Sequence, residues 1–302
     1  MLKVDIIGAA TSFGQPKLGV DLGPDALRYA NLVEEVKSRD IEVNDKGNIY
    51  SDFKVDISTH STGGDKVLKN YEQVVNFNEK LAASADESVT SGAFPLILGG
   101  DHSLAIGSLA GISRHYENLG VIWYDAHGDL NDINTSPSGN LHGMPLAISC
   151  GVGDERLVNL HTPGIKVKPQ NIVLIGMRDL DEGEKEYIRG ENILMYTMDD
   201  IEEKGIAAVM TEALEYLRKK TDGIHLSFDV DALDPSETPG TGTPVHNGLS
   251  LSETIHAMNI LHESRSITSM DLVEVNPLLD DRNMTAEKAV AIVAALFGKE
   301  RK

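Results

Sequence analysis

Cysteine is almost absent from this sequence, since Cys150 is the only one among its 302 residues. A lone thiol excludes a disulfide within the chain, and it cannot build a structural zinc site from several thiolates. This usage suits the reducing cytoplasm, and we expect the protein to reside there. Hydrophobic residues make up 41% of the chain, which is ample for a large core.

Long hydrophobic runs are also lacking. No apolar stretch approaches the roughly 18 residues that span a bilayer. The first residues, Met1 to Gly8, lack the charged start and long apolar stretch of a secretory signal, and they read directly as a strand. We therefore expect neither a membrane protein nor a secreted one.

Basic residues are few: 27 lysines and arginines stand against 47 acidic residues, for a net charge of −20. Nucleic acids and anionic membrane surfaces need a basic face, so neither is expected as a partner. An acidic protein can attract cationic small molecules. By itself, however, the negative net charge needs no explanation beyond keeping the protein soluble.

Short apolar runs alternate with amphipathic patterns along most of the chain. The runs predict strands at Val4–Ile7, Pro95–Leu98, Val121–Tyr124, Asn171–Ile175, Ile193–Tyr196, Ile224–Phe228 and Ser269–Val273. The amphipathic patterns predict helices near Asp25–Leu32, Asp65–Ala83, Leu104–His115, Ala207–Lys220, Ser252–Glu263 and Ala286–Phe297. Strands joined by helices predict an α/β fold with a parallel sheet covered on both faces. The polar, turn-rich stretch Lys37–Gly64 indicates a surface excursion.

Polar residues follow these predicted strands. In parallel sheets, ligands bind at the carboxyl ends of the strands. The polar residues at those ends are His102, Asp125, His127, Asp129, Asp179, Asp181, Asp229, Asp231 and Glu274. Five strands that deliver such groups to one edge indicate an active site.

Two segments, Asp125-Ala-His127-Gly-Asp129 and Asp229-Val-Asp231, carry metal-binding residue types at alternate positions. If the strands continue through these segments, the listed side chains point to one face of the sheet, because side-chain direction alternates with a period of two residues. Carboxylate and imidazole ligands suit a divalent ion such as Mn²⁺. Four carboxylates overcharge one such ion but balance two. A single motif of this kind often only caps a turn, but both motifs together with His102 predict a binuclear metallohydrolase.

The glycines of Gly99-Gly100-Asp101-His102-Ser103 permit a second interpretation, a phosphate-binding loop. The segment lacks the lysine and the spacing of such loops. The glycines more plausibly let the chain turn tightly and bring His102 to a metal.

Taken together, these motifs resemble the arginase (ureohydrolase) family. The resemblance rests on Gly-Gly-Asp-His102, on the two aspartate motifs and on Glu274-Val-Asn-Pro, and it extends from Gly19-Val-Asp-Leu-Gly-Pro24 and Arg28 to the last helix. It implies that residues 1–302 form one three-layer α/β/α domain around an eight-stranded, mostly parallel sheet. It also implies two Mn²⁺ ions per subunit and assembly into trimers or hexamers.

The resemblance further implies the ligands of each ion. One ion is assigned to His102, Asp125, Asp129 and Asp229, and the other to Asp125, His127, Asp229 and Asp231, with Asp125 and Asp229 bridging. A hydroxide between the ions is expected to attack the guanidinium of L-arginine, giving L-ornithine and urea. Asp129 is expected to handle the proton of that hydroxide, His142 to shuttle protons and Glu274 to pair with the guanidinium.

The substrate's other groups are assigned in the same way. Neutral donors suit an α-carboxylate and acidic groups suit an α-amino group. The residues implied for substrate binding are Asn131, Ser138 and Asn140 for the carboxylate, Asp181 and Glu184 for the amine, and Thr243. Small departures from the family pattern are Gly128 and Ala232, neither of which removes a ligand.

Three alternatives remain open. An agmatinase or another guanidino-acid ureohydrolase shares the metal motifs, but agmatine has no carboxylate for Ser138 and Asn140 to bind. A zinc deacetylase of related fold would use one ion, and the presence of both His102 and Asp231 argues against it. A non-catalytic homologue that binds arginine or metal would be signalled by loss of His142 or Glu274, and both are present.

Overall fold

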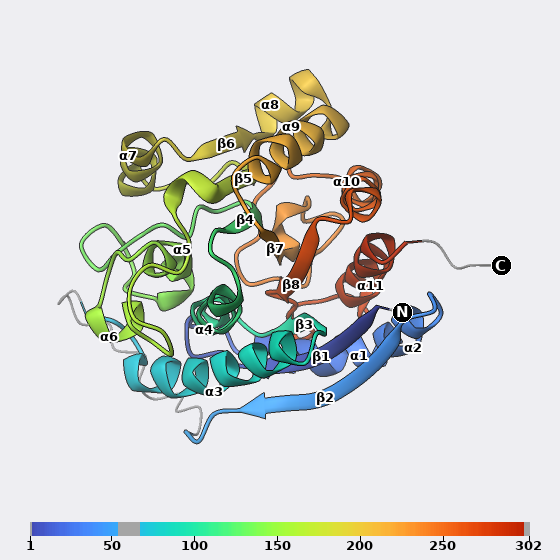
Figure 1. Ribbon diagram of the computed structural model, residues 1–302, viewed down its shortest axis with the longest axis horizontal. Helices are drawn as coiled ribbons and strands as arrows, with labels where there is room; N and C mark the ends of the chain where they lie inside the picture. Colours follow the sequence, from blue (N-terminus) through green and yellow to red (C-terminus); the bar gives the residue numbers. More distant parts are fainter. Residues whose placement is uncertain (1, 54–66, 299–302) are drawn as a thin grey trace.

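An eight-stranded sheet forms the centre of the computed structural model, which describes residues 2–53 and 67–298 (Figure 1). The strands are β1 (Lys3–Ala10), β2 (Glu42–Tyr50), β3 (Phe94–Gly99), β4 (Leu119–Tyr124), β5 (Ile172–Met177), β6 (Leu194–Thr197), β7 (Gly223–Asp229) and β8 (Ile267–Val273). They lie in the order β2-β1-β3-β8-β7-β4-β5-β6, and every neighbouring pair is parallel. The expected eight-stranded α/β sheet is thus confirmed, and among the described strands it is wholly parallel.

Helices cover both faces of this sheet (Figure 1). They are α1 (Gly23–Tyr29), α2 (Leu32–Lys37), α3 (Tyr71–Thr90), α4 (Ala105–Ile112), α5 (Pro145–Ser149), α6 (Glu155–Val158), α7 (Glu182–Glu191), α8 (Met198–Lys204), α9 (Ile206–Arg218), α10 (Leu251–Ser264) and α11 (Met284–Leu296). Successive residues of β4 show the two faces: Ile122 belongs to the core under α1, α2 and α8–α11, whereas Val121 and Trp123 belong to the core under α3, α4 and α5. β3, β4 and β5 are buried on both sides, which is why they read as nearly unbroken apolar runs, whereas β7 and β8 also bury polar residues such as His225 and Asp271.

All seven predicted strands are present, but β2 was not predicted from the sequence. The interpretation of Lys37–Gly64 as a surface excursion was wrong for Glu42–Tyr50, and its last part, 54–64, lies outside the described residues. β2 is an edge strand that pairs only with β1, and most of its residues are exposed or half-buried. It therefore needs no apolar run, and hydrophobic periodicity cannot reveal it.

The six predicted helices are also found, with shifted ends. The pattern near Asp25–Leu32 corresponds to α1, which ends at Tyr29. Asn31, with a left-handed φ of 71°, separates α1 from α2, which was not predicted beyond Leu32. The helix expected at Asp65–Ala83 begins at Tyr71 and continues to Thr90, while 65–66 lie outside the described residues. α5 to α8 were not predicted.

Among the described residues, no helix combines the length and hydrophobicity that crossing a membrane requires.

Candidate active site

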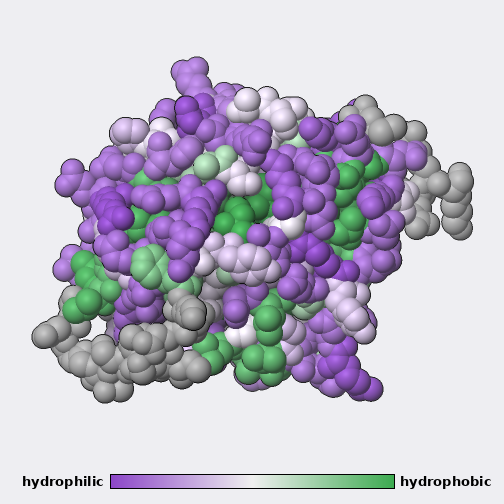
Figure 2. Space-filling model, turned by 90° about the horizontal axis from the view of Figure 1, so that it is seen from below, coloured by the Kyte–Doolittle hydropathy of each residue, from purple (hydrophilic) through white to green (hydrophobic). Residues whose placement is uncertain are grey.

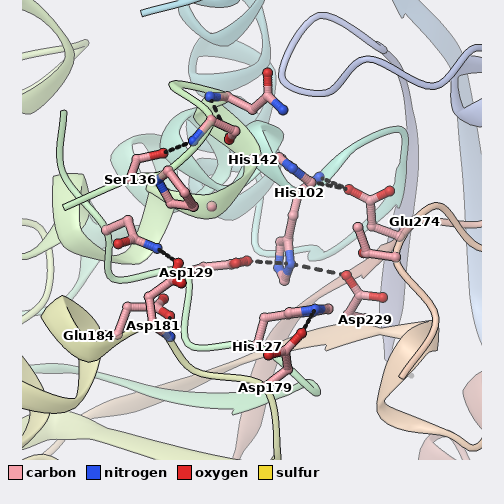
Figure 3. A pocket seen from close by; sticks show the side chains of 16 residues that line it. His102, His127, Asp129, Ser136, His142, Asp179, Asp181, Glu184, Asp229 and Glu274 are labelled. Atoms are coloured by element: carbon pink, nitrogen blue, oxygen red, sulfur yellow. Dashed lines mark hydrogen bonds and ion pairs between the residues drawn. The ribbon is translucent and has the colours of Figure 1, made fainter. Parts of the chain in front are cut away.

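A pocket of about 260 Å³ opens at the carboxyl ends of the strands (Figure 3). Most of the predicted site residues line it. They are His102, His127, Asp129, Asn131, Ser138, Asn140, His142, Asp181, Glu184, Asp229, Thr243 and Glu274. The remaining two, Asp125 and Asp231, are buried and contact the histidines of the pocket. The structure therefore brings together groups from segments that are far apart in the sequence.

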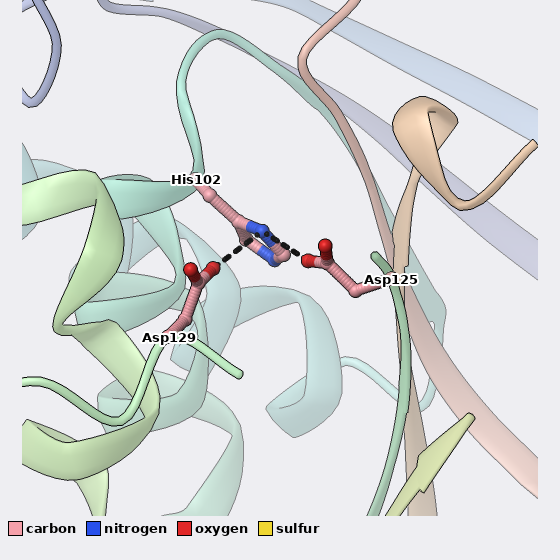
Figure 4. A group of neighbouring side chains, drawn as sticks. All are labelled: His102, Asp125 and Asp129. Atoms are coloured by element: carbon pink, nitrogen blue, oxygen red, sulfur yellow. Dashed lines mark ion pairs between the residues drawn. The ribbon is translucent and has the colours of Figure 1, made fainter. Parts of the chain in front are cut away.

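His102 lies at the centre of a first ligand group. Its Nδ1 atom is 3.1 Å from Asp125 Oδ2, 3.0 Å from Asp129 Oδ2 and 3.3 Å from Asp229 Oδ2 (the first two are drawn in Figure 4). One ring nitrogen carries at most one hydrogen and cannot satisfy three carboxylates. This convergence of one nitrogen and three oxygens is the arrangement expected around a cation.

The His102 ring is fixed from its other sides. It stacks on Trp123 with ring centres 4.2 Å apart and an interplanar angle of 5°. Its Nε2 atom lies 2.8 Å from Ser227 Oγ. If Nε2 carries the hydrogen and donates it to Ser227, the lone pair of Nδ1 faces the carboxylates. Metal-binding histidines are commonly oriented through their second nitrogen in this way.

His127 belongs to a second ligand group. Its Nδ1 atom lies 3.2 Å from Asp231 Oδ2 and 3.4 Å from Asp125 Oδ1. Asp125 thus offers Oδ2 to the first group and Oδ1 to the second. The ligand atoms of His102, Asp125 and Asp129 lie close enough together to hold one ion, and so do those of Asp125, His127 and Asp231.

Two carboxylates of the site, those of Asp229 and Asp231, have raised pKa values, whereas the hydrogen bonds of His102 and His127 lower the pKa of Asp125 despite its burial. Burial, together with the charges of Asp231 and Asp125, raises the pKa of Asp229 well above its usual value. Burial and the charge of Asp125 also raise the pKa of Asp231, to about 6. In addition, His102 Nδ1 and Asp125 Oδ2 are buried atoms without a hydrogen-bond partner among the described residues. These observations fit divalent cations, and the oxygen and imidazole donors suit Mn²⁺-type ions.

The expected strand geometry of the aspartate motifs was wrong. β4 ends at Tyr124, so Asp125, His127 and Asp129 lie beyond it, and Asp129 adopts a φ of 51°. β7 ends at Asp229, and Asp231 lies in the 3-10 turn Val230–Ala232. Turns just after the strands, rather than strand alternation, bring these ligands together.

Glu274 joins the ligand region to His142. Its Oε1 atom accepts a hydrogen bond from the backbone N–H of His102 at 2.8 Å and lies 3.6 Å from His142 Nδ1. Its Oε2 atom lies 3.5 Å from Gln15 Nε2, the donor of a long hydrogen bond. Burial disfavours the charged form of His142, but the hydrogen bond and charge of Glu274 outweigh it and raise the pKa of His142. His142 is therefore equipped to hold a proton beside the pocket.

The segments expected to bind the substrate's α-substituents both line the pocket and contact each other. Asn131 Nδ2 donates to Asp181 Oδ2 at 2.9 Å. Glu184 accepts hydrogen bonds from the backbone N–H groups of Leu130 and Asp181, at 3.0 and 2.9 Å. Burial raises the pKa of Glu184 to about 7. Ser138 Oγ accepts from the Asn140 N–H at 3.2 Å.

Gly128, one departure from the family pattern, lies against this acidic segment. A Cβ atom at this position would lie 2.9 Å from Glu184 Oε1 and from Leu180 Cδ2. Glycine therefore gives Glu184 room to approach the loop between the metal ligands.

Sequence reasoning missed several residues of the site. Ser136 and Asp179 line the pocket but were given no role in the predicted site, although Asp179 follows a predicted strand. Gln15, Trp123 and Ser227 contact its functional residues. Ser227 and Trp123 lie two residues before aspartate ligands, Asp229 and Asp125, inside strands that read as ordinary core.

Comparison with known proteins finds similarity over nearly the whole chain. A family profile described as the Arginase family matches residues 2–298. An arginase of Staphylococcus aureus (strain MSSA476) is 54% identical over 297 residues, which are 98% of this chain and 97% of that protein. The solved structure of arginase from Bacillus caldovelox is 50% identical with a TM-score of 0.95, and 99% of each chain is covered. Entamoeba histolytica arginase, solved in complex with L-ornithine, is 31% identical with a TM-score of 0.90, covering 99% of this chain and 100% of that one.

Proposed function

Because the chain belongs to the arginase family, we propose that it is an arginase, an amidinohydrolase that converts L-arginine and water to L-ornithine and urea. The observation that carries this proposal is the pair of ligand groups joined by Asp125, beside a pocket that also contains His142 and Glu274. The ornithine complex of the Entamoeba relative supports the substrate class. In this proposal residues 1–302 form one domain.

Two Mn²⁺ ions per subunit are proposed as the resident cofactor. His102, Asp125 and Asp129 would hold one ion, and Asp125, His127 and Asp231 the other. Asp229, whose Oδ2 lies 3.3 Å from His102 Nδ1, is proposed to bridge the two ions together with Asp125. Two ions supply four positive charges against four aspartates, which relieves the crowding of buried carboxylates.

Hydrolysis of a guanidinium needs a nucleophile at its planar carbon and a proton for the departing amine. When bound, a pair of divalent ions lowers the pKa of water from about 15.7 toward neutrality and so supplies the nucleophile. Asp129 lines the pocket, with Oδ2 3.0 Å from His102 Nδ1, and is placed to accept a proton from an attacking water. Glu274 is placed to pair with the guanidinium. His142, beside Glu274, is placed to pass a proton to the departing amine of ornithine.

The α-substituents of arginine are proposed to fix its orientation. Ser138 and Asn140, with the amide of Asn131, would donate to the carboxylate, since all three line the pocket. Asp181 would accept from the α-amino group, and Glu184 would act on it through water. Thr243 also lines the pocket, and its hydroxyl donates to Asp231 Oδ2 at 3.1 Å. Thr243 is thus proposed to join substrate binding to a metal ligand.

A small cationic substrate also agrees with the surface. The face shown in Figure 2 is mainly hydrophilic, with small hydrophobic patches. The net charge is −20, which disfavours nucleic acid and anionic membranes as partners. The single cysteine, which is buried, agrees with the proposed location in the cytoplasm.

A homo-oligomer, trimer or hexamer, is also proposed. Leu18, Leu22, Leu278 and Leu279 are each at least 40% exposed. The two loops that carry them are joined by a hydrogen bond from Asn276 Nδ2 to Leu18 O at 3.0 Å. A subunit contact would remove these leucines from water. Light scattering of the purified protein tests this, and a monomer at micromolar concentration would contradict it.

The direct test of the proposed function is metal-dependent urea release. The Mn²⁺-loaded protein is expected to release urea and ornithine from L-arginine in equal amounts. Removal of the metal by a chelator should abolish the reaction, and restored Mn²⁺ should recover it. A protein that holds two ions and releases no urea would instead support a non-catalytic arginine- or metal-binding role.

A further inference from the structure

Arg178 lies next to the site but is not one of the groups that the proposed mechanism uses. It follows β5 and precedes Asp179 of the pocket. Its guanidinium nitrogens, which carry five N–H groups, lie 2.6 to 3.2 Å from six backbone carbonyl oxygens, with at least one hydrogen shared: those of Gly176, Asp231, Ala232, Leu233, Val245 and His246. None of these acceptors is a carboxylate. The guanidinium therefore acts as a clamp on the backbone rather than as an ion-pair partner.

The shortest of these bonds reaches a metal ligand. Arg178 Nη2 donates to the backbone oxygen of Asp231 at 2.6 Å. The same nitrogen donates to Val245 O at 2.8 Å, two residues after Thr243. Thr243 in turn donates to the Asp231 carboxylate. The clamp thus fixes Asp231 directly and also fixes the loop that orients its carboxylate.

The backbone of Arg178 holds the other half of the same ligand group. Its N–H donates to Ala126 O at 3.0 Å, and the N–H of Asp179 donates to the same oxygen at 3.1 Å. Ala126 lies between the ligands Asp125 and His127. The N–H of Ala126 also donates to Asp231 Oδ1, at 3.3 Å. Arg178 therefore joins both segments from which the second ligand group is built.

The first ligand group is supported by other residues. Trp123 and Ser227 orient the His102 ring, and Glu274 accepts from the His102 N–H. The backbone oxygen of Asp129 accepts from the N–H groups of Leu146 and Ala147, which lie in α5. Arg178 makes none of these contacts, so His102 and Asp129, which belong to the first group alone, are supported without it, whereas Asp125 is shared by both groups.

We propose that Arg178 is a positioning residue that holds His127 and Asp231, the ligands that belong to the second group alone, in place for their cation, so that loss of its guanidinium weakens that cation site more than the other. The proposal rests on the proposed binuclear function. It concerns a residue that contacts neither the cations nor the substrate and acts through the backbone of the ligands. Because metal ligands must converge within a few tenths of an ångström, a loosened backbone costs affinity at this group first.

The test is Mn²⁺ binding by equilibrium dialysis, with bound metal measured per subunit against free Mn²⁺. Arg178→Lys keeps the positive charge, but its single nitrogen cannot span six carbonyls. We expect it to bind one ion with the affinity of the unchanged protein and the second roughly 10- to 100-fold more weakly. His127→Asn, which removes a ligand of the second group, provides the reference curve for a protein with only the first site intact.

Arg39→Lys is the matched control. Arg39 also donates to backbone oxygens, those of Ala294 and Gly298 at 3.0 and 2.7 Å, but it joins the end of α2 to α11 and contacts no site residue. It should lower thermal stability without changing either metal affinity. Circular dichroism and thermal unfolding establish that each variant is folded before its metal is counted.

Equal weakening of both sites in Arg178→Lys, or unchanged binding of both ions, would overturn the inference while leaving the binuclear function intact. So would loss of the second ion in Arg39→Lys, because the effect would then reflect general destabilisation. Failure of the unchanged protein itself to bind two ions would instead contradict the proposed cofactor, and the inference would fall with it.

Discussion

Two functional residues adopt the left-handed backbone conformation, which residues other than glycine and asparagine seldom adopt. Asp129 has a φ of 51° and Glu274 a φ of 63°. Such conformations cost roughly 1–3 kcal/mol each and persist only where surrounding contacts enforce them. Hydrogen bonds from the backbone of Leu146 to Asp129 O, and from the Glu274 N–H to Gly100 O, provide that support. Both conformations turn a carboxylate into the pocket, so local strain accompanies the placement of the acids.

The proton-transfer role of His142 makes the first prediction at this scale. His142→Ala removes the group that would protonate the departing amine, while the two metal ligand groups keep all of their side chains. We expect kcat to fall roughly 100-fold or more with two Mn²⁺ ions still bound. Steady-state urea release and metal analysis of the same sample measure this. A variant with full kcat would refute the shuttle role.

Single residues are also where the sequence was most informative, and where its limits are clear. The proposed metal ligands were inferred from carboxylates and imidazoles placed just after apolar runs, and the structure brings their side chains together. Their geometry does not follow, because the turn after β4 and the left-handed Asp129 depend on contacts with distant segments. The same reason hides Gln15 and Ser227, whose roles come from side chains that meet across the fold.

At the scale of single elements, α10 offers a test of how local sequence stabilises the fold. Ser250 caps this helix: its Oγ accepts from the Glu253 N–H at 3.3 Å, and Glu253 Oε2 accepts from the Ser250 N–H at 2.9 Å. Ser250→Ala should lower the free energy of unfolding by about 1 kcal/mol. Urea denaturation followed by circular dichroism measures the loss. Ser264→Ala, at the other end of α10, is the control and should have a smaller effect; an equal loss would argue against the cap.

Asp86, in α3, is joined to two further segments through ionisable groups: the turn Ser113–His115 and the loop that carries His161. Its carboxylate lies 2.7 Å from His115 Nε2 and 3.0 Å from His161 Nε2, and it also binds Arg114. Burial acts to raise the pKa of Asp86, but the hydrogen bonds from the two histidines and the charge of Arg114 outweigh it and lower the pKa. A lowered pKa of Asp86 in the folded state means that the ionised carboxylate is more stable in the folded protein than in the unfolded chain.

The sign of the pH effect follows directly. The stabilisation by Asp86 is fully present above the unfolded pKa of about 3.8 and is lost as the pH falls through the lower folded value. Asp86→Asn should therefore lower the free energy of unfolding by about 1 kcal/mol at pH 7. The difference from the unchanged protein should shrink below about pH 4. Denaturant titrations at pH 7 and in the acidic range measure it, and a constant difference would contradict the account.

Elements differ in how visible they are in the sequence. β3, β4 and β5 are covered on both faces and show as apolar runs, whereas β2 at the edge does not. The short α5 and α6 also escape detection, because four or five residues carry no helical period. The central strands of the sheet were thus predictable from the sequence. Its edge strand and its connecting turns were not, because they depend on tertiary contacts.

The whole molecule should depend on its metal ions for stability. Ions that bind the folded site and not the unfolded chain stabilise the fold by about 2.7 kcal/mol at a free concentration 100 times the dissociation constant. Chelation should therefore lower the Tm by roughly 5 °C or more. Differential scanning calorimetry with and without a chelator measures the shift, and restored Mn²⁺ should reverse it. An unchanged Tm would mean that the buried carboxylates do not bind these ions.

The central claim concerns the whole substrate, and a comparison of L-arginine with agmatine tests it most directly. The two compounds share the guanidinium but agmatine lacks the α-carboxylate that Ser138, Asn140 and Asn131 are proposed to bind. The kcat/KM for urea release is predicted to favour arginine by roughly 10⁴-fold, because a site built for hydrogen bonds rejects a compound that cannot make them. Equal or preferred hydrolysis of agmatine would contradict the assignment of these residues and make the protein a ureohydrolase of another specificity.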